Sequence, residues 1–444
     1  MGARTGPGGR DRLRACGVDT RRTVSRAAGW TRGERAGWIE PGERRNRKET
    51  GRVSANTGAS LADGTRAALG RTVFAPVWLT LGVVALLSLW GLSIPLWVQY
   101  VPFLASVLVV GLPHGAVDHL AAARLGGDRP SHPFAAVAAL YLLVGSAYLV
   151  AWRLAPAASF ALFVALTWFH WGQGDLYVLV ALPERTHLRS SLGRGLCLLV
   201  RGGLPMIVPL LAFPDTYRAV ARTVIELFDP GAVAALEPLF SIPARLALGG
   251  GLTALSVVAL AVGYHGARNG HERDGNRRLD DRRGSGSHGR SDDGGDGETE
   301  ADVRKRAWRL DAAETVLLWA YFLIVPPILA VGLYFCLWHS LRHVVRVIVL
   351  SDDERAAGSE DGTTPAAGAA KKGFVRFARE ATPLTAGALV IFAGLYLLAP
   401  VTDVSGVLAL YLVLLAVLTL PHIIVVSWMD LEQGVWKGRE TTGA

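Results

Sequence analysis

Residues 404–428 read VSGVLALYLVLLAVLTLPHIIVVSW, a stretch of 25 residues without a lysine, arginine, aspartate or glutamate. An α-helix rises about 1.5 Å per residue, so a helix of this length crosses the roughly 30 Å hydrocarbon core of a bilayer. The segment therefore predicts a membrane-spanning helix.

Similar apolar segments recur along the chain between blocks of charge. They lie at 74–94, 98–122, 134–152, 157–181, 193–213, 246–264, 312–325, 328–350 and 383–399. Segment 193–213 contains two arginines, and segment 312–325 is short and ends at a pair of prolines. Either of these two can be interfacial or re-entrant rather than spanning. The pattern predicts an all-α fold, a polytopic integral membrane helical bundle of roughly 8–10 transmembrane helices.

The overall composition supports this class. Of the 444 residues, 51% are hydrophobic and 19% are charged, which is too apolar for a disordered chain or an ordinary soluble enzyme. The net charge of +9 does not indicate nucleic-acid binding, because most of the basic residues lie near the N-terminus and at 268–309, where they set membrane orientation. The three cysteines are far apart, so neither a disulfide framework nor a cysteine metal site is indicated.

The polar blocks divide the chain into regions. We expect a disordered basic N-terminal extension at 1–71, transmembrane helices at 72–264, a disordered charged loop at 265–311, a transmembrane hairpin with His339 and His343 at 312–350, a polar cytoplasmic linker at 351–382, C-terminal transmembrane helices at 383–430 and a tail at 431–444. A transit peptide is the competing interpretation of the first region, but its four glutamates argue against one.

Charge asymmetry sets the expected orientation. With a cytoplasmic N-terminus and alternating crossings, four arginine-bearing connections fall on the cytoplasmic side, at 123–133, 182–192, 265–311 and 351–382. This agrees with the positive-inside rule. We therefore predict a multi-pass protein of the cell membrane.

Histidines interrupt four of the apolar segments. They occur in GLPHGAVDHL (111–120), WFHWGQGDL (168–176), CLWHSLRHVVRV (336–347) and LTLPHIIVVSWMD (418–430). Ionisable residues inside a membrane are costly and are functional candidates by default. In the expected topology these segments all run from outside to inside, and their histidines lie between mid-depth and the cytoplasmic end. They can therefore share one layer and bind one metal ion, whose ligands must converge to about 2.0–2.2 Å.

Spacing separates the histidines further. His339 and His343 are four residues apart and lie on one helical face. His114 and His119 are five apart, a poorer match, and we favour His114 because the proline and glycine beside it open the helix. His119 is then a supporting or access residue, and Asp118 can orient an imidazole through its other ring nitrogen.

Other polar residues near the histidines admit more than one interpretation. Asp175 follows His170 by five residues and is either a hydrogen-bond acceptor that supports a ligand or a buried polar plug. Arg342 and Arg346 are typical of snorkelling or positive-inside residues at a membrane exit, but Arg342 is also a secondary candidate to support a ligand or contact the substrate.

The type of side chain limits the metal and its chemistry. Neutral imidazoles without thiolates suit iron, zinc or copper, and the residues alone do not select one. Zinc hydrolases need water and polar substrates, whereas an apolar membrane cavity suits O₂ activation at a non-haem ferrous centre. Oxidation of a hydrophobic molecule is therefore favoured.

The strings GLPHGAVDH, FHWGQGD, YFCLWHSLRH and LPHIIVVSWMD resemble the motifs of the bacteriorhodopsin-related (Brp/Blh) family of β-carotene 15,15′-dioxygenases. The resemblance covers 74–430 apart from the two polar insertions, and the motifs occur in the family's order. It implies an integral membrane enzyme that uses Fe(II) and O₂ to cleave β-carotene at its central double bond. The two all-trans-retinal products would supply a microbial rhodopsin.

The resemblance also implies roles for individual residues. Carried over by position, the iron ligands and catalytic residues are His114, His170, His339 and His343. His422 and His119 match family motifs as well and are secondary candidates. Aromatic residues beside the ligands can line a tunnel for the polyene or simply pack in the bundle; they are Trp168, Phe169, Trp171, Tyr177, Tyr334, Phe335 and Trp338.

Two other classes of protein remain as alternatives. A membrane lipid desaturase or hydroxylase with a di-iron centre also uses intramembrane histidines, but it needs richer clusters such as HxxHH, which the sequence lacks. A transporter can use an intramembrane pathway of histidine, aspartate and arginine. The absence of an internal repeat weakens that interpretation.

Overall fold

Helices form all of the regular secondary structure in the residues that the structure describes. This computed structural model describes residues 70–124, 132–183, 186–268, 300–356, 366–399 and 401–437. Within a bilayer the backbone N–H and C=O groups must be hydrogen-bonded inside the protein, and an α-helix achieves this within one segment. The expected all-α fold is therefore confirmed.

The long helices follow the apolar segments of the sequence. They are α3 (Ala75–Leu89), α7 (Pro133–Leu154), α8 (Pro156–Ala181), α9 (Ser191–Ala212), α11 (Ile242–Arg268), α13 (Glu300–Ile324), α16 (Ala366–Leu398) and α17 (Val404–Glu432). The shorter elements are η1 (Gly70–Phe74), α4 (Leu96–Leu108), α5 (Gly111–Gly115), α6 (Asp118–Arg124), α10 (Pro214–Glu226), η2 (Pro230–Phe240), α14 (Pro327–Leu333), η3 (Tyr334–Ser340) and α15 (Leu341–Ala356).

Eight helical stretches in the described part of the chain are long and apolar enough to cross a membrane. Their outward side chains are large and apolar: Leu142 on α7 is 69% exposed, Val257 on α11 63% and Val390 on α16 73%. In water such surfaces would favour aggregation, whereas lipid solvates them. The chain is a multi-pass membrane protein, as the sequence predicts.

Four predicted boundaries differ from the structure. The loop expected at 265–311 is helical at both ends, because α11 continues to Arg268 and α13 begins at Glu300; residues 269–299 lie outside the described residues. The exposed start of α13 is stabilised by a pair between Arg304 and Glu300 at 3.3 Å. The linker expected at 351–382 is also partly helical, since α15 extends to Ala356 and α16 begins at Ala366.

The two ends of the chain are described only in part. Residues 1–69, nearly all of the expected extension at 1–71, lie outside the described residues, and so do 438–444 of the expected tail. Segment 193–213, for which an interfacial position was an alternative, forms the continuous and largely buried helix α9.

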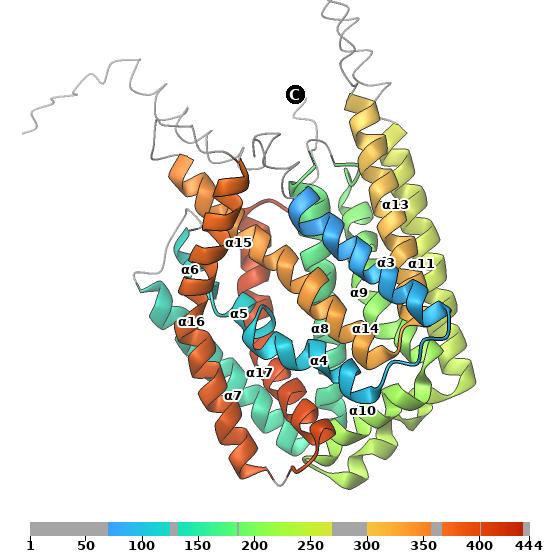
Figure 1. Cartoon of the computed structure of the whole chain (residues 1–444), viewed down its shortest axis with the longest axis vertical. Coiled ribbons are helices and arrows are strands. Elements are labelled where there is room, and N and C mark those ends of the chain that lie inside the picture. Colours follow the sequence, from blue (N-terminus) through green and yellow to red (C-terminus); the bar gives the residue numbers. More distant parts are fainter. Residues whose placement is uncertain are drawn as a thin grey trace, which may run out of the picture. The chain divides into compact units, whose positions relative to one another are not determined.

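Helix α8 lies at the centre of the packing. It contacts α9 along its length, and α9 in turn contacts α11 and α13 (Figure 1). The approach of α8 to α9 is so close that a Cβ atom at Gly202 would lie 1.8 Å from the carbonyl oxygen of Trp168. On its other sides α8 contacts α7, α15 and α17, and α5 lies against α15, α16 and α17. Helices α5, α8, α15 and α17, together with η3, thus converge on one region.

Candidate metal centre and substrate pocket

Five histidine side chains meet where these elements converge. They are His114 on α5, His170 on α8, His339 in η3, His343 on α15 and His422 on α17, and none is more than 8% exposed. The centroid of the His170 ring lies 4.7 Å from those of His339 and His422 and 4.8 Å from that of His343. The structure thus brings the four ligand candidates together and adds His422. We refer to these five residues as the histidine cluster.

The cluster contains two overlapping triads with metal-binding spacing. The ring nitrogens of His114, His170 and His422 lie within 4.8 Å of one another, and so do those of His170, His339 and His343. Nitrogens at such separations can converge on one ion at about 2.0–2.1 Å after small rotations of the rings. His170 is the member common to both triads.

Local breaks in the helices position two of these side chains. The segment around His114 is divided into α4, α5 and α6, in agreement with the expected opening of the helix at this histidine. His339 lies in η3, a π-helix of seven residues that continues directly into α15 with His343. Single π-turns within α-helices are frequent at functional sites because they rotate side chains out of the ordinary register.

The donor atoms of the cluster fit a bound metal ion. At least one ring nitrogen of His170, His339, His343 and His422 is buried without a hydrogen-bond partner among the described residues. Such an orphaned atom destabilises the fold by about 1–3 kcal/mol. A glycine keeps the space free, since a Cβ atom at Gly174 would lie 2.9 Å from Nε2 of His343. An all-imidazole set of this kind suits a divalent transition metal.

The two polar residues that follow His114 take separate positions. Asp118 Oδ2 lies 2.8 Å from Nδ1 of His422 and accepts a hydrogen bond from the Tyr141 hydroxyl at 2.6 Å. His119 lies apart from the histidine cluster, with its ring 5.5 Å from that of Phe134.

A second buried group, the ionic cluster, lies beside the histidines. Its guanidinium groups bridge three carboxylates, with Arg201 contacting Asp311 at 2.6 Å and Glu314 at 2.9 Å. Arg342 contacts Glu314 at 2.8 Å and Asp175 at 3.3 Å, and Arg201 contacts Asp175 at 3.4 Å. Asp175 is thus a member of an ion-pair network. We use the name ionic cluster for these five residues.

The interpretation of two arginines as snorkelling residues is wrong. Arg342 is 2% exposed, and its guanidinium lies 3.8 Å above the ring of Trp338. Arg346 is 1% exposed and pairs with Asp430 at 2.8 Å. Both arginines face carboxylates inside the bundle, because a buried charge requires a partner.

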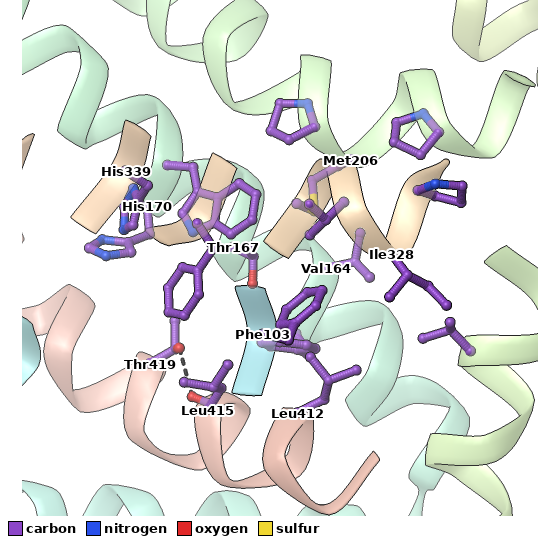
Figure 2. A pocket seen from close by; sticks show the side chains of 18 of the residues that line it. Phe103, Val164, Thr167, His170, Met206, Ile328, His339, Leu412, Leu415 and Thr419 are labelled. Atoms are coloured by element: carbon purple, nitrogen blue, oxygen red, sulfur yellow. Dashed lines mark hydrogen bonds between the residues drawn. The ribbon is translucent and has the colours of Figure 1, made fainter. Parts of the chain in front are cut away.

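An apolar pocket extends from the histidine cluster between α4, α8, α9, α10, α14 and α17. In Figure 2 the rings of His170 and His339 lie together at one end, and Phe103, Val164 and Leu412 surround the space beyond them. Further lining residues include Phe160, Phe163, Thr167, Pro205, Met206, Pro209, Thr216, Tyr217, Val220, Ile328, Val331, Leu408, Leu415 and Thr419. The pocket is therefore suited to a long hydrophobic molecule.

One polar lining residue comes from a helix outside the candidate spans. Tyr217 lies on α10, and burial raises the pKa of its hydroxyl above the ordinary value. The hydroxyl therefore stays neutral at physiological pH, and the pocket wall at α10 remains uncharged.

The seven predicted aromatic residues take different positions relative to the pocket. Trp171 and Phe335 line the pocket next to the metal candidates. Tyr334 and Trp338 are fully buried and are not among the lining residues of this pocket. Trp168 donates a hydrogen bond to the carbonyl oxygen of Leu199 at 2.7 Å and joins α8 to α9. Two further aromatics lie elsewhere: Phe169 is 37% exposed, and the Tyr177 ring packs under Arg346.

Several residues of the site lie outside the sequence motifs. Arg201 and Glu314 lie in segments 193–213 and 312–325, the two doubtful spans, and a charge inside an apolar segment was the available signal. His187 lies in the connection between α8 and α9 and contacts Asp311 at 2.9 Å. Tyr141 lies in an otherwise unremarkable apolar helix, and nothing in the sequence distinguishes it. Helix α10 lies between the predicted apolar segments 193–213 and 246–264, so its pocket residues were not candidates.

The chain is similar to known proteins over most of its length. A family model described as β-carotene 15,15′-dioxygenase matches residues 105–430, which include all five histidines. A protein of Halobacterium salinarum named probable β-carotene 15,15′-dioxygenase Blh is 40% identical over 374 residues, covering 83% of this chain and 95% of its own length. Another from the same species, named probable β-carotene 15,15′-dioxygenase Brp, is 32% identical over 355 residues, covering 78% and 88%. No solved structure matches the chain.

Proposed function

Because the chain belongs to the β-carotene 15,15′-dioxygenase family, we propose that it cleaves the central double bond of β-carotene with O₂. The bond between C15 and C15′ breaks, and each carbon receives one oxygen atom. One carotene thus gives two molecules of all-trans-retinal, and no other oxidant or reductant is needed. The observation that carries this proposal is the apolar pocket that ends at buried histidines with unpaired nitrogens.

We propose Fe(II) as the cofactor, with His114, His170, His339 and His343 as its ligands. The donor set supports this, because imidazole nitrogens bind ferrous iron and no thiolate or carboxylate belongs to either triad. When bound, the iron supplies the ability to activate O₂, which amino-acid side chains lack.

The side chains of the chain hold the substrate and keep water out. Phe335 and Trp171 flank the histidines and can contact the flat faces of the polyene. Thr167 and Thr419 are among the few polar lining residues, and Thr419 donates its hydroxyl hydrogen to the carbonyl oxygen of Leu415 at 2.7 Å. A wall of this kind offers water few partners, so a reactive product of O₂ is protected from side reactions.

The membrane supplies the substrate in this proposal. An extended carotenoid is about as long as the roughly 30 Å hydrocarbon core of a bilayer, and it reaches the pocket laterally from the lipid. The chain would lie in the cell membrane with its N-terminus in the cytoplasm, where the arginine-rich connections favour that side. Its retinal would be available to a microbial rhodopsin.

Cells that accumulate β-carotene provide the test of this function. The unaltered chain and the variants His114→Ala and His119→Ala are expressed, and retinal and remaining carotene are quantified by chromatography. We expect about two retinal per carotene lost with the unaltered chain and with His119→Ala, and none with His114→Ala, because only His114 lies in the histidine cluster. Unchanged carotene beside well-inserted, unaltered protein would overturn the proposal.

The iron content of the purified protein distinguishes this enzyme from the di-iron alternative. One iron per chain supports the proposal, and two would favour a desaturase-like centre.

A substitution in the pocket wall tests where the substrate binds. Leu412→Trp fills the pocket beside Val164 and Phe103, so we expect iron to be retained while cleavage falls at least 10-fold. The matched control is Leu142→Trp on the lipid-facing side of α7, which should retain both.

A further inference from the structure

Asp118 is a buried carboxylate without a cationic side chain beside it. It is 4% exposed, and among the residues that the structure describes its ion-pair contact is with His422 and with no lysine or arginine. The buried Asp175 and Asp430, by contrast, each contact an arginine. An isolated buried charge is strongly unfavourable, and a metal ion bound by His422 would supply the positive charge that no lysine or arginine brings to Asp118.

His422 connects this carboxylate to the histidine cluster. Its Nδ1 lies 2.8 Å from Asp118 Oδ2, so this nitrogen carries the hydrogen and donates. The lone pair is then on Nε2, which is buried and has no hydrogen-bond partner among the described residues. The His422 ring lies 4.7 Å from that of His170 and 5.2 Å from that of His114, measured between centroids. His422 is therefore oriented as a donor toward the same point as the ligand candidates.

Tyr141 holds the same carboxylate through a second hydrogen bond. Its hydroxyl on α7 donates to the same oxygen, Asp118 Oδ2, at 2.6 Å. His114, on the other hand, has only the carbonyl oxygen of Val110 at 3.3 Å and the Ser340 hydroxyl at 3.5 Å near its Nδ1. Among the described residues, His422 is thus the one member of the histidine cluster that a carboxylate holds.

From these contacts we propose that His422 is a fifth nitrogen donor to the metal and that Asp118 and Tyr141 are its positioning residues. The carboxylate supplies the negative charge that the dication requires, and it makes the imidazole a stronger donor. The inference rests on the proposed metal centre and adds a ligand and its support to it.

Metal affinity and stability of the purified chain test this inference. The variants are His422→Ala, Asp118→Asn and Tyr141→Phe, and Tyr148→Phe is the matched control. Tyr148 also lies on α7 and donates one buried hydrogen bond, to the carbonyl oxygen of Ser159 at 2.8 Å. The dissociation constant for Fe(II) is measured by competition with a chelator. We expect a 10- to 100-fold increase for Asp118→Asn, a smaller one for Tyr141→Phe and none for Tyr148→Phe.

Two further measurements distinguish a role toward the metal from a structural one. X-ray absorption of the ferrous protein should lose one imidazole donor in His422→Ala. Metal-free Asp118→Asn should melt at or above the temperature of the metal-free parent, because an uncompensated charge is gone, whereas its Fe(II) form should melt below that of the parent. Equal losses in both forms, or an unchanged absorption spectrum in His422→Ala, would overturn the inference. Failure of the unaltered chain to bind iron would instead overturn the proposed function.

Discussion

The histidine cluster and the ionic cluster lie side by side in the bundle. They differ in how their buried polar atoms are paired. In the ionic cluster each of the three carboxylates contacts at least one guanidinium. In the histidine cluster, buried ring nitrogens lack partners among the described residues. The carboxylates of the first cluster have cationic partners within the protein, and among its five residues only Arg342 has buried nitrogens without a hydrogen-bond partner in the described part of the chain. The convergence of several unpaired imidazole nitrogens, rather than buried polarity itself, therefore marks the candidate reactive centre.

The ion pairs of the ionic cluster connect helices that also carry the histidines. Asp175 lies on α8, five residues after His170, and Arg342 lies next to His343 on α15. The ion pairs between these helices, and to Arg201 on α9 and Glu314 on α13, fix the backbones that carry the histidines. Ion pairs can thus fix the positions of His170 and His339, whose ring nitrogens have no hydrogen-bond partner among the described residues.

The largest expected effect comes from breaking the histidine cluster at its shared member. His170→Ala removes a donor from both triads, so we expect stoichiometric iron to be lost and retinal formation to fall at least about 1,000-fold, of order 4 kcal/mol in transition-state stabilisation. Iron per chain and retinal by chromatography are the measurements. The metal-free variant should unfold like the metal-free parent, because the ionic cluster is intact. Full iron content in His170→Ala would contradict the proposed ligand set.

The next effect tests the ionic cluster. Arg201→Met keeps an apolar stem but leaves Asp311 without its guanidinium partner and Glu314 with Arg342 alone. We expect a loss of about 3–5 kcal/mol in the free energy of unfolding, measured in mild detergent. The control, Arg153→Met, changes an exposed arginine on α7 and should be nearly neutral. A loss in Arg201→Met as small as in the control would show that the ion pairs are not structural.

The contrast between the clusters also explains what the sequence can reveal about the fold. Apolar length identifies the helices, because a bilayer requires about 20 apolar residues per crossing. The two doubtful segments, 193–213 and 312–325, contain opposite charges, on Arg201 and Glu314, that neutralise each other in the structure. The partners are 113 residues apart, and pairing over such a separation is not visible in local sequence. The same charge that argues against a span is thus part of what holds the bundle together.

The candidate site could also be predicted from the sequence only in part. Matched depth and the spacing of His339 and His343 identify the metal candidates, since both follow from helix geometry. The partner of Asp118 was not predictable, because it is His422 from the end of the chain. Nor does the local sequence predict the π-helix that contains His339. Long-range packing determines these features.

Removal of the metal should lower the unfolding free energy only of variants that keep the histidine cluster intact. A ligand present at 100 times its Kd stabilises the folded state by about 2.7 kcal/mol, so a chelator should lower the unfolding free energy of the iron-loaded parent by about that amount. His170→Ala should be insensitive to the chelator, because it no longer binds iron. Arg201→Met should still respond, since its histidines remain. A chelator effect of the same size in His170→Ala would place the metal elsewhere.

The smallest predicted effect is the difference in unfolding free energy between losing a hydrogen bond to a charged carboxylate and losing one to a neutral carbonyl group. Trp338 donates its Nε1 hydrogen to Asp175 at 2.9 Å, and Trp168 donates its own to the carbonyl oxygen of Leu199 at 2.7 Å. Hydrogen bonds to charged groups contribute about 1.5–3 kcal/mol, and neutral ones about 0.5–1.5 kcal/mol. We expect Trp338→Phe to lose about 1.5 kcal/mol in unfolding free energy, since Asp175 keeps both arginines, and Trp168→Phe to lose less. Iron binding should survive in both, because neither indole contacts a metal candidate. If Trp338→Phe loses no more than Trp168→Phe, the arginines alone neutralise Asp175, and the indole only fills space beneath Arg342.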